Sequence, residues 1–230
     1  MQQAAAGAPS GSICLAVRQH AGRGRHGRSW ISPAGGNLYL SLLWRFAISS
    51  AQLGALSLAV GVGIASALTM LGASDLVLKW PNDLHWQRRK LGGILLEVSG
   101  DRHASAAVIG IGINRVLDAE HAAMIDQPWV DLATVLAATK QPLIGHDLLA
   151  GAIISALLDL LPRYATSGLT AFLSDWAQFD GYRGESVTVN GEISGRYLGI
   201  NSQGALQLEQ QGQVRSIQSG EVQLCRIYTQ

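Results

Sequence analysis

Residues 22–30 contain three arginines and three glycines and end in Trp30, and apolar segments at 13–17 and 38–44 flank them. Both segments have the pattern of buried strands, so the loop between them is expected to be held in place by a packed domain. Glycine lets the backbone approach a ligand closely, arginine presents forked donors to phosphate or carboxylate, and the indole offers a face for stacking a base. The feature favours a loop that binds an anionic ligand carrying a flat ring. Its composition alone is equally typical of a solvated arginine-glycine segment that binds RNA weakly.

The composition indicates a globular protein without strong overall charge. The chain has 230 residues, of which 48% are hydrophobic and 14% charged, enough for one full core and a small appended module. A net charge of +1 argues against bulk attraction to nucleic acid or anionic lipid. Any preference for polyanions must come from a local cluster of arginines, Arg18, Arg23, Arg25 and Arg28. Cys14 and Cys225 lie far apart without metal-ligand spacing, which is typical of reduced thiols in a cytoplasmic protein.

Hydrophobic periodicity predicts a mixed α/β region in most of the chain. Residues 51–71 carry no charge and are about long enough to cross a bilayer, but their many small residues favour a helix packed on a sheet. The N-terminus has neither the basic segment nor the apolar core of a secretory signal. Further strands are predicted at 75–80, 90–98 and 105–113, with a polar hairpin tip at 87–89, and helices at 131–137 and 146–164.

After Asp180-Gly181 the pattern changes to short alternating segments at 186–189, 193–198, 205–208 and 214–217, separated by Asn-Gly, Gln-Gly and Ser-Gly pairs. Closely spaced strands with this turn chemistry are typical of a small barrel. We therefore predict an α+β protein, with a mixed-sheet domain over residues 1–180 and a small β-barrel over residues 181–230.

Three short motifs place polar side chains at the ends of apolar strands. In Lys79-Trp80-Pro81-Asn82-Asp83, the Asn-Asp pair supplies oxygen ligands for Mg²⁺ and the lysine supplies a point charge for phosphate. A turn whose side chains cap their own backbone is the simpler interpretation of its last three residues. Lys90 precedes Gly92-Gly93 at the mouth of an apolar strand, where a solvated edge lysine is the ordinary alternative. Gly110-x-Gly112-x-Asn114 is weak alone and also fits tight strand packing.

In combination and order, these motifs resemble those of the biotin protein ligases: the arginine-glycine loop, Lys-Trp-Pro-Asn-Asp, Lys-Leu-x-Gly-Ile and Gly-x-Gly-x-Asn. The resemblance runs from about Ser12 to the C-terminus and includes Ser32-Pro33 and Asn37-Leu38-Tyr39-Leu40-Ser41. It implies a class II synthetase-like catalytic domain followed by an SH3-like β-barrel. It also implies that biotin and ATP are joined as biotinyl-5′-adenylate, and that biotin then passes to a lysine on the biotin carboxyl carrier protein or domain of acetyl-CoA carboxylase.

The resemblance also implies roles for individual residues. Biotin would be bound by Gln19, Arg23, Gly24, Arg25 and Lys90. ATP would be bound by Arg28 at the phosphates, by Trp30 near the adenine, and by Lys79, Asn82, Asp83 and Asn114. Asn82 and Asp83 would hold Mg²⁺, and Lys90, Arg25 and Asp83 would be the catalytic residues. Fixed cations suit this chemistry, because negative charges meet when a carboxylate attacks the α-phosphorus of ATP.

Three departures from the family pattern affect these expectations. His26 stands where the family often has arginine, which lowers the positive charge near the phosphates. The residues before Ile13 contain no Ser/Thr-Asn motif of the kind that contacts biotin in the family, so we expect an N-terminally truncated catalytic domain and, as an alternative, an inactive truncated ligase. No helix-turn-helix domain precedes the ligase region, so no DNA binding is expected.

Two other functions stay open. A related acyl-adenylate ligase for lipoate or another carboxylic acid would differ in its ligand preference. A nucleic-acid-binding module using the arginine-glycine loop would bind with strong salt dependence and without Mg-ATP. Whether the protein is a biotin ligase or a lipoate-type ligase, we expect it in the cytoplasm and not at a membrane. Relatives in the family that dimerise through sheet edges suggest a homodimer.

Overall fold

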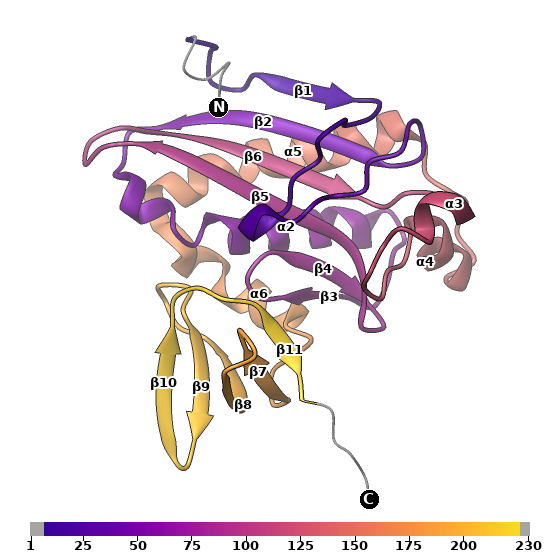
Figure 1. Ribbon diagram of the computed structural model, residues 1–230. Coiled ribbons are helices and arrows are strands. Elements are labelled where there is room, and N and C mark those ends of the chain that lie inside the picture. The colour runs from indigo at the N-terminus through magenta and orange to yellow at the C-terminus, as the bar shows by residue number, and fades with distance from the viewer. Residues whose placement is uncertain (1–6, 226–230) are drawn as a thin grey trace, which may run out of the picture.

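The computed structural model describes residues 7–225, which form a six-stranded and a five-stranded sheet (Figure 1). The larger sheet has the order β1-β2-β6-β5-β4-β3, and its neighbouring strands pair antiparallel. Its strands are β1 (Ile13–Ala16), β2 (Leu38–Phe46), β3 (Leu76–Lys79), β4 (Asp83–Trp86), β5 (Arg89–Gly100) and β6 (Ser105–Ile113). The predicted α+β class is confirmed, and parallel pairing enters through isolated bridges, Leu78–Asp180 and Lys90–Trp129.

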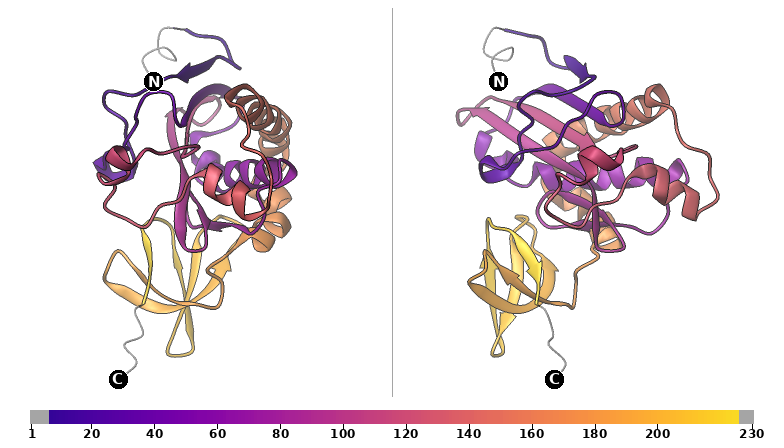
Figure 2. Two further views of the ribbon diagram at one scale, coloured as in Figure 1. Left: turned by 90° about the vertical axis from the view of Figure 1, so that its right-hand side faces the viewer. Right: turned by 45° about the vertical axis from the view of Figure 1, so that its right-hand side comes forward.

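Helices cover one face of this sheet, and the arginine-glycine loop lies over the other (Figure 2). The described residues form helices α2 (Leu56–Met70), α3 (Ala119–Ala122), α4 (Leu132–Ala138), α5 (His146–Ser167) and α6 (Leu173–Phe179). Of these, α2 and α5 pack on the covered face, and α3 lies on the side of the loop. Three 3₁₀ turns, η1 (Arg25–Gly27), η2 (Ser50–Leu53) and η3 (Gly168–Phe172), complete the helical elements of the described residues. The face that carries the loop and α3 is therefore the one open to a ligand.

Small residues let α2 pack tightly between the sheet and α5. A Cβ atom at Gly61 would lie 3.2 Å from the side chain of Leu78 in β3, and one at Gly63 would lie 3.0 Å from that of Leu160 in α5. By length and composition, Ser50–Met70 and His146–Phe179 could each cross a membrane, but 67% of the most apolar 18-residue window of the first stretch is buried inside the fold. The predicted small-residue helix packed on a sheet is confirmed.

The predicted strands and main helices are present, with one correction at the N-terminal strand. We expected both segments flanking the arginine-glycine loop to be buried, and β2 is. In contrast, Ile13 and Leu15 of β1 are 40% and 53% exposed, because this strand lies at the sheet edge and pairs with β2 alone. The loop is therefore anchored by one core strand and one exposed strand. The short helices α3 and α6 were not predicted.

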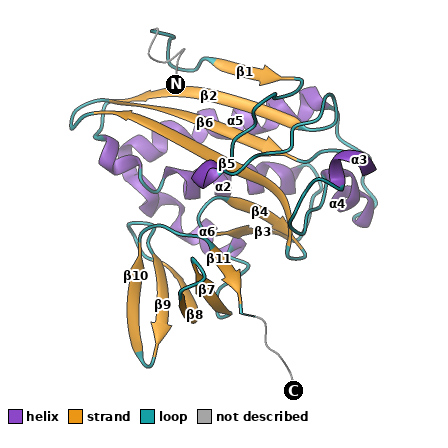
Figure 3. Cartoon of the chain, viewed as in Figure 1, coloured by secondary structure: helices purple, strands orange, loops and turns teal. Residues whose placement is uncertain are grey.

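The C-terminal region consists of strands and loops (Figure 3) and forms the second sheet, in the order β10-β9-β8-β7-β11. Its strands are β7 (Ser186–Val189), β8 (Ile193–Ile200), β9 (Leu206–Gln210), β10 (Gln213–Ile217) and β11 (Val222–Leu224). The predicted Asn190-Gly191 turn is present, with φ values of 55° and 72°. Four of these strands were predicted and β11 was not. The domain boundary at residues 180/181 stays a prediction.

A buried hydrogen bond joins the two regions. Trp80 Nε1, at the end of β3, donates to the carbonyl of Gly204 over 2.9 Å. Gly204 has φ 78° and packs closely, because a Cβ there would lie 2.7 Å from Ala55 and 2.8 Å from Leu58. Within the Lys-Trp-Pro-Asn-Asp motif, Trp80 therefore has a structural role. Its hydrogen bond attaches the C-terminal region next to the polar residues Asn82 and Asp83.

Candidate active site

A cavity of about 740 Å³ lies between the arginine-glycine loop and the strands of the larger sheet. Its floor comes from β2, β5 and β6, its walls from the arginine-glycine loop and residues 124–129, and one margin from the C-terminal sheet. Every site residue predicted from sequence lines this cavity: Gln19, Arg23, Gly24, Arg25, Arg28, Trp30, Lys79, Asn82, Asp83, Lys90 and Asn114. The fold therefore brings four separate motifs to one place.

The arginine-glycine loop folds back on itself, so that its arginines reach into the cavity. Main-chain bonds from Gly24 N to Arg28 O (2.7 Å) and from Trp30 N to Gly22 O (2.9 Å) close the loop. His26 and Gly27 make the tight turn with φ values of 55° and 73°. This turn conformation places Arg25 and Arg28 on the cavity side.

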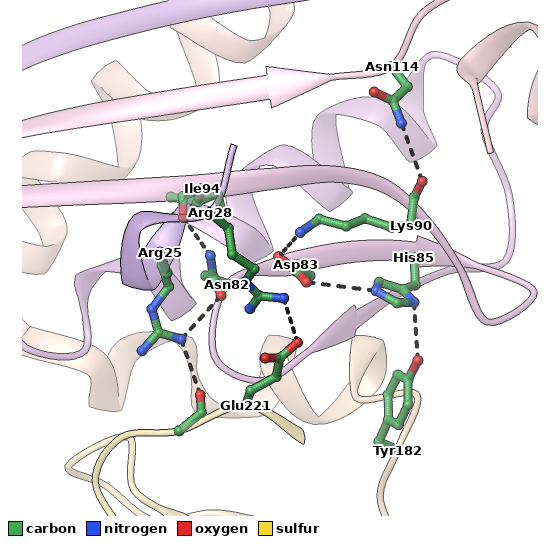
Figure 4. Close-up of polar contacts among 11 residues, drawn as sticks. Arg25, Arg28, Asn82, Asp83, His85, Lys90, Ile94, Asn114, Tyr182 and Glu221 are labelled. Carbon is green, nitrogen blue, oxygen red and sulfur yellow. Dashed lines mark hydrogen bonds and ion pairs between the residues drawn. The ribbon is translucent and has the colours of Figure 1, made fainter. Parts of the chain in front are cut away.

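Two of these arginines contact the C-terminal sheet (Figure 4). Arg25 Nη1 donates to Asn82 Oδ1 over 3.4 Å and to the carbonyl of Gly220 over 3.3 Å. Arg28 Nη1 pairs with Glu221 Oε1 at 2.8 Å. Burial lowers the pKa of the Arg25 guanidinium, and the nearby Asp83 carboxylate opposes that effect. The loop and the segment just before the last strand of the C-terminal sheet therefore border the same side of the cavity.

A β-bulge places Lys90 on the cavity face of the sheet. In the pairing of β4 with β5, Leu84 lies opposite Gly92, but the next residue, His85, lies opposite Lys90. The extra residue on β5 turns the lysine to the side that Asp83 and His85 share, because side chains alternate along a strand. Lys90 Nζ then lies 2.8 Å from Asp83 Oδ1, and both side chains are largely buried.

Trp30 forms part of the cavity wall and rests on a glycine. A Cβ atom at Gly112 would lie 2.8 to 2.9 Å from three atoms of the Trp30 ring, so the indole needs a residue without a side chain below it. Lys90 Nζ lies 5.4 Å from the Trp30 ring centroid, within the range of a cation–π contact. Packing against Trp30 thus explains why position 112 of the Gly-x-Gly-x-Asn motif is glycine, and it links this motif to the arginine-glycine loop.

The remaining predicted residues lie around the cavity with partners of their own. Asn114 Nδ2 donates to the carbonyls of Lys90 (3.4 Å) and Val130 (3.3 Å), so its amide orders the main chain at Lys90. Gln19 Oε1 accepts a bond of 3.0 Å from Ser32 Oγ. Burial lowers the pKa of Lys79, and the carboxylates of Asp83 and Glu221 oppose this shift.

The sequence analysis did not identify three polar side chains at the site, two glutamates and a histidine. Glu97 on β5 pairs with Arg23 at 3.0 Å, Glu221 pairs with Arg28, and His85 lies beside Asp83 with its Nε2 4.0 Å from Asp83 Oδ2. Alternation along β4 could have indicated His85, because it shares a face with Asp83. Glu221 follows a turn in the C-terminal sheet, where no local pattern connects it to a loop almost two hundred residues earlier.

Asn82 and Asp83, the predicted Mg²⁺ ligands, do not form a metal centre by themselves. Asp83 Oδ1 faces the ammonium of Lys90, and Asn82 Oδ1 faces the guanidinium of Arg25. Among residues 7–225, no cluster of three or more His, Cys, Asp or Glu side chains could hold a metal ion. The described residues therefore do not form a metal centre from protein side chains alone.

The sequence matches models of two protein families. Residues 3–114 match the Biotin/lipoate A/B protein ligase family, and residues 184–224 match the Biotin protein ligase C terminal domain. The chain is 40% identical to the bifunctional ligase/repressor BirA of Escherichia coli (strain K12), over 94% of this chain and 67% of that protein. It is 34% identical to the biotin--[acetyl-CoA-carboxylase] ligase of Paracoccus denitrificans, over 84% of this chain and 81% of that protein.

Solved structures show the same fold. A biotin protein ligase from Aquifex aeolicus, in complex with biotin and ATP, superposes with a TM-score of 0.78 at 28% identity, over 95% of this chain and 90% of that one. The catalytic-domain match, the C-terminal-domain match and this superposition cover the cavity-bearing sheet and the C-terminal sheet together. This chain belongs to the biotin protein ligase family.

Proposed function

We propose that this protein is a biotin protein ligase, which activates biotin with ATP and transfers it to a lysine on the biotin carboxyl carrier domain of acetyl-CoA carboxylase. The observation that carries this proposal is the convergence of the predicted residues on one cavity. The names of relatives support it, since one is a biotin--[acetyl-CoA-carboxylase] ligase and another was solved with biotin and ATP. The activity is therefore that of a ligase enzyme.

In the first step, the carboxylate of biotin attacks the α-phosphorus of ATP, and pyrophosphate leaves. The negative charges of the carboxylate and the triphosphate meet in this step, so the cavity must supply fixed positive charge and hold the reactants in line. Arg28 and Lys79 line the cavity, and so do Arg25 and Lys90. We assign the phosphates to the first pair and the reacting carboxylate and α-phosphate to the second.

In the second step, the amine of the carrier lysine attacks the carbonyl of the mixed anhydride, and AMP leaves. Negative charge develops on the carbonyl oxygen and on the departing phosphate. Lys90 is suited to stabilise both, because Asp83 holds its ammonium at 2.8 Å and the surrounding walls exclude most solvent. Neither step requires a covalent bond between substrate and protein.

Mass spectrometry of a carrier domain incubated with this protein, biotin and Mg-ATP tests the proposal. We expect a biotinyl adduct on one lysine that disappears when ATP, biotin or magnesium is omitted. Lys90→Ala should slow adenylate formation by orders of magnitude without loss of folding, measured by circular dichroism. Arg25→Ala should release the adenylate from the cavity, measured as free biotinyl-adenylate in the filtrate.

Competition among carboxylic acids separates this function from the lipoate alternative. Biotin should be used far better than lipoate, because the similar proteins of known name are biotin ligases. An adduct formed from lipoate alone, or one independent of ATP, would contradict the proposal. Location in the cytoplasm and association of two copies stay predictions, which cell fractionation and sedimentation would test.

A further inference from the structure

A buried histidine connects the Lys90–Asp83 pair to the segment that leads into the C-terminal sheet. His85 is 5% exposed and lies on the same face of β4 as Asp83. One edge of its ring faces Asp83, with Nε2 4.0 Å from Asp83 Oδ2. At the other edge, Nδ1 lies 3.1 Å from the hydroxyl of Tyr182, which follows α6 (Figure 4). The imidazole thus lies between the catalytic pair and the connecting segment.

Tyr182 is itself held firmly. The residue is 3% exposed, and its ring meets that of His85 edge to face, with centroids 5.9 Å apart. The guanidinium of Arg88 covers the other side at 4.6 Å from the ring centroid, and it also donates to the carbonyl of Gly181 over 2.8 Å. An ion pair between Arg88 and Glu185 holds this guanidinium from the other side. The tyrosine hydroxyl therefore has a fixed position beside His85.

The charge of Asp83 decides which tautomer of His85 suits this arrangement. A neutral imidazole has one N–H donor and one nitrogen lone pair. If Tyr182 donates its hydroxyl proton to Nδ1, the ring carries its own proton on Nε2, and that N–H points toward the Asp83 carboxylate. The opposite tautomer would turn a lone pair toward a negative charge in a buried site, which is unfavourable.

We propose that Tyr182 and His85 are positioning residues for the ligase reaction: Tyr182 donates to Nδ1 of His85 and, together with the charge of Asp83, holds the imidazole in its Nε2–H tautomer, which orients the Asp83 carboxylate and through it the ammonium of Lys90. This inference rests on the proposed function for its kinetic effect, but its structural part stands apart from it. On this proposal, the segment between α6 and β7, which contains Tyr182, contributes to catalysis in the first domain. Tyr182 contacts His85 only when the C-terminal region is packed against that domain.

The tautomer can be measured without any ligase assay. Long-range proton–nitrogen NMR spectra of the full chain, with ¹⁵N-labelled histidines, distinguish a protonated Nε2 from a protonated Nδ1, and His85→Gln assigns the signal. We expect the Nε2–H form in the parent protein and a mixture of tautomers in Tyr182→Phe. An Nδ1–H form in the parent, or an unchanged spectrum in the variant, would overturn the proposal even if the protein is a fully active ligase.

Kinetics of adenylate formation test the consequence. Tyr182→Phe should lower kcat about tenfold, the usual cost of losing a hydrogen bond that orients a functional side chain, with little change in the KM for biotin or ATP. Tyr164→Phe is the matched control, because it removes another buried hydroxyl, which donates to the carbonyl of Gln52 far from the cavity. Equal effects of the two variants on kcat would refute the positioning role.

Two substitutions of the histidine separate positioning from packing. His85→Gln keeps an amide donor near the place of Nε2, whereas His85→Asn keeps one only near the place of Nδ1. We expect the glutamine variant to retain most of the parent kcat and the asparagine variant to lose about tenfold, as Tyr182→Phe does. The reverse order would overturn the proposal. Thermal melting of each variant checks that the fold is intact.

Discussion

Gly112→Ala should disturb the cavity through Trp30. The added Cβ would lie 2.8 Å from the ring, whereas ordinary contact begins near 3.4 Å, so the indole must retreat by about 0.6 Å. The main chain of Trp30 is fixed to Gly22 over 2.9 Å, which prevents the whole residue from sliding away. Overpacking of this kind costs about 1–3 kcal/mol. If the ring recovers its position only when ligand binds, that cost weakens binding by roughly 5- to 150-fold.

Titration calorimetry with biotin and with ATP measures this effect, and Gly110→Ala provides the control. Gly110 lines the same cavity from the same strand, but a Cβ there would make ordinary contacts of 3.4 and 3.7 Å with Leu95. We expect the control to bind both ligands as the parent does, and Gly112→Ala to bind at least one of them clearly more weakly. Equal affinities of the two variants for both ligands would refute the reasoning.

Three further outcomes follow from individual contacts. Trp80→Phe removes the buried bond to the carbonyl of Gly204, so urea denaturation should show a loss of about 1–2 kcal/mol, and an unchanged midpoint would contradict this. Burial lowers the pKa of His85 from 6.5 to about 4, so its contribution to stability is complete above pH 6.5 and is lost as the pH falls toward 4. Protonation of His85 should lower the free energy of unfolding by about 2 kcal/mol between pH 7 and pH 5, and this loss should be absent from His85→Gln. Asp131→Ala removes the N-cap of α4, whose Oδ1 accepts from Thr134 N over 2.9 Å, and should lower stability by about 1 kcal/mol in a melting experiment; equal melting temperatures would count against the cap.

Local patterns predicted the elements of this fold well. Alternation and apolar runs placed β6 and β7 at the residues where they occur, and turn residues indicated the hairpins at Gln87-Arg88 and Asn190-Gly191, where φ is positive. These features depend on neighbours within a few positions, so they can be read along the chain. The short helices α3 and α6 and the strand β11 lack such periodicity and were missed.

The residues of the cavity were also predicted from the sequence, since their chemistry and their order in the family resemblance both indicate a ligase. Their contacts were not. These contacts join residues that are paired across strands or between regions. They are the bulge at Leu91 that turns Lys90 toward Asp83, the packing of Trp30 on Gly112, and the hydrogen bond between Tyr182 and His85. Sequence spacing alone does not reveal which of two faces a bulged strand presents.

The sequence by itself determined the kinds of groups at the site and the secondary structure that carries them, because propensity, periodicity and side-chain chemistry are properties of short segments. Only the tertiary structure decided that β1 is exposed, that Glu221 reaches Arg28, and that four motifs share one cavity. Those facts depend on how distant segments pack against a common core. Packing is set by the sum of many contacts across the whole chain, and no local pattern records that sum.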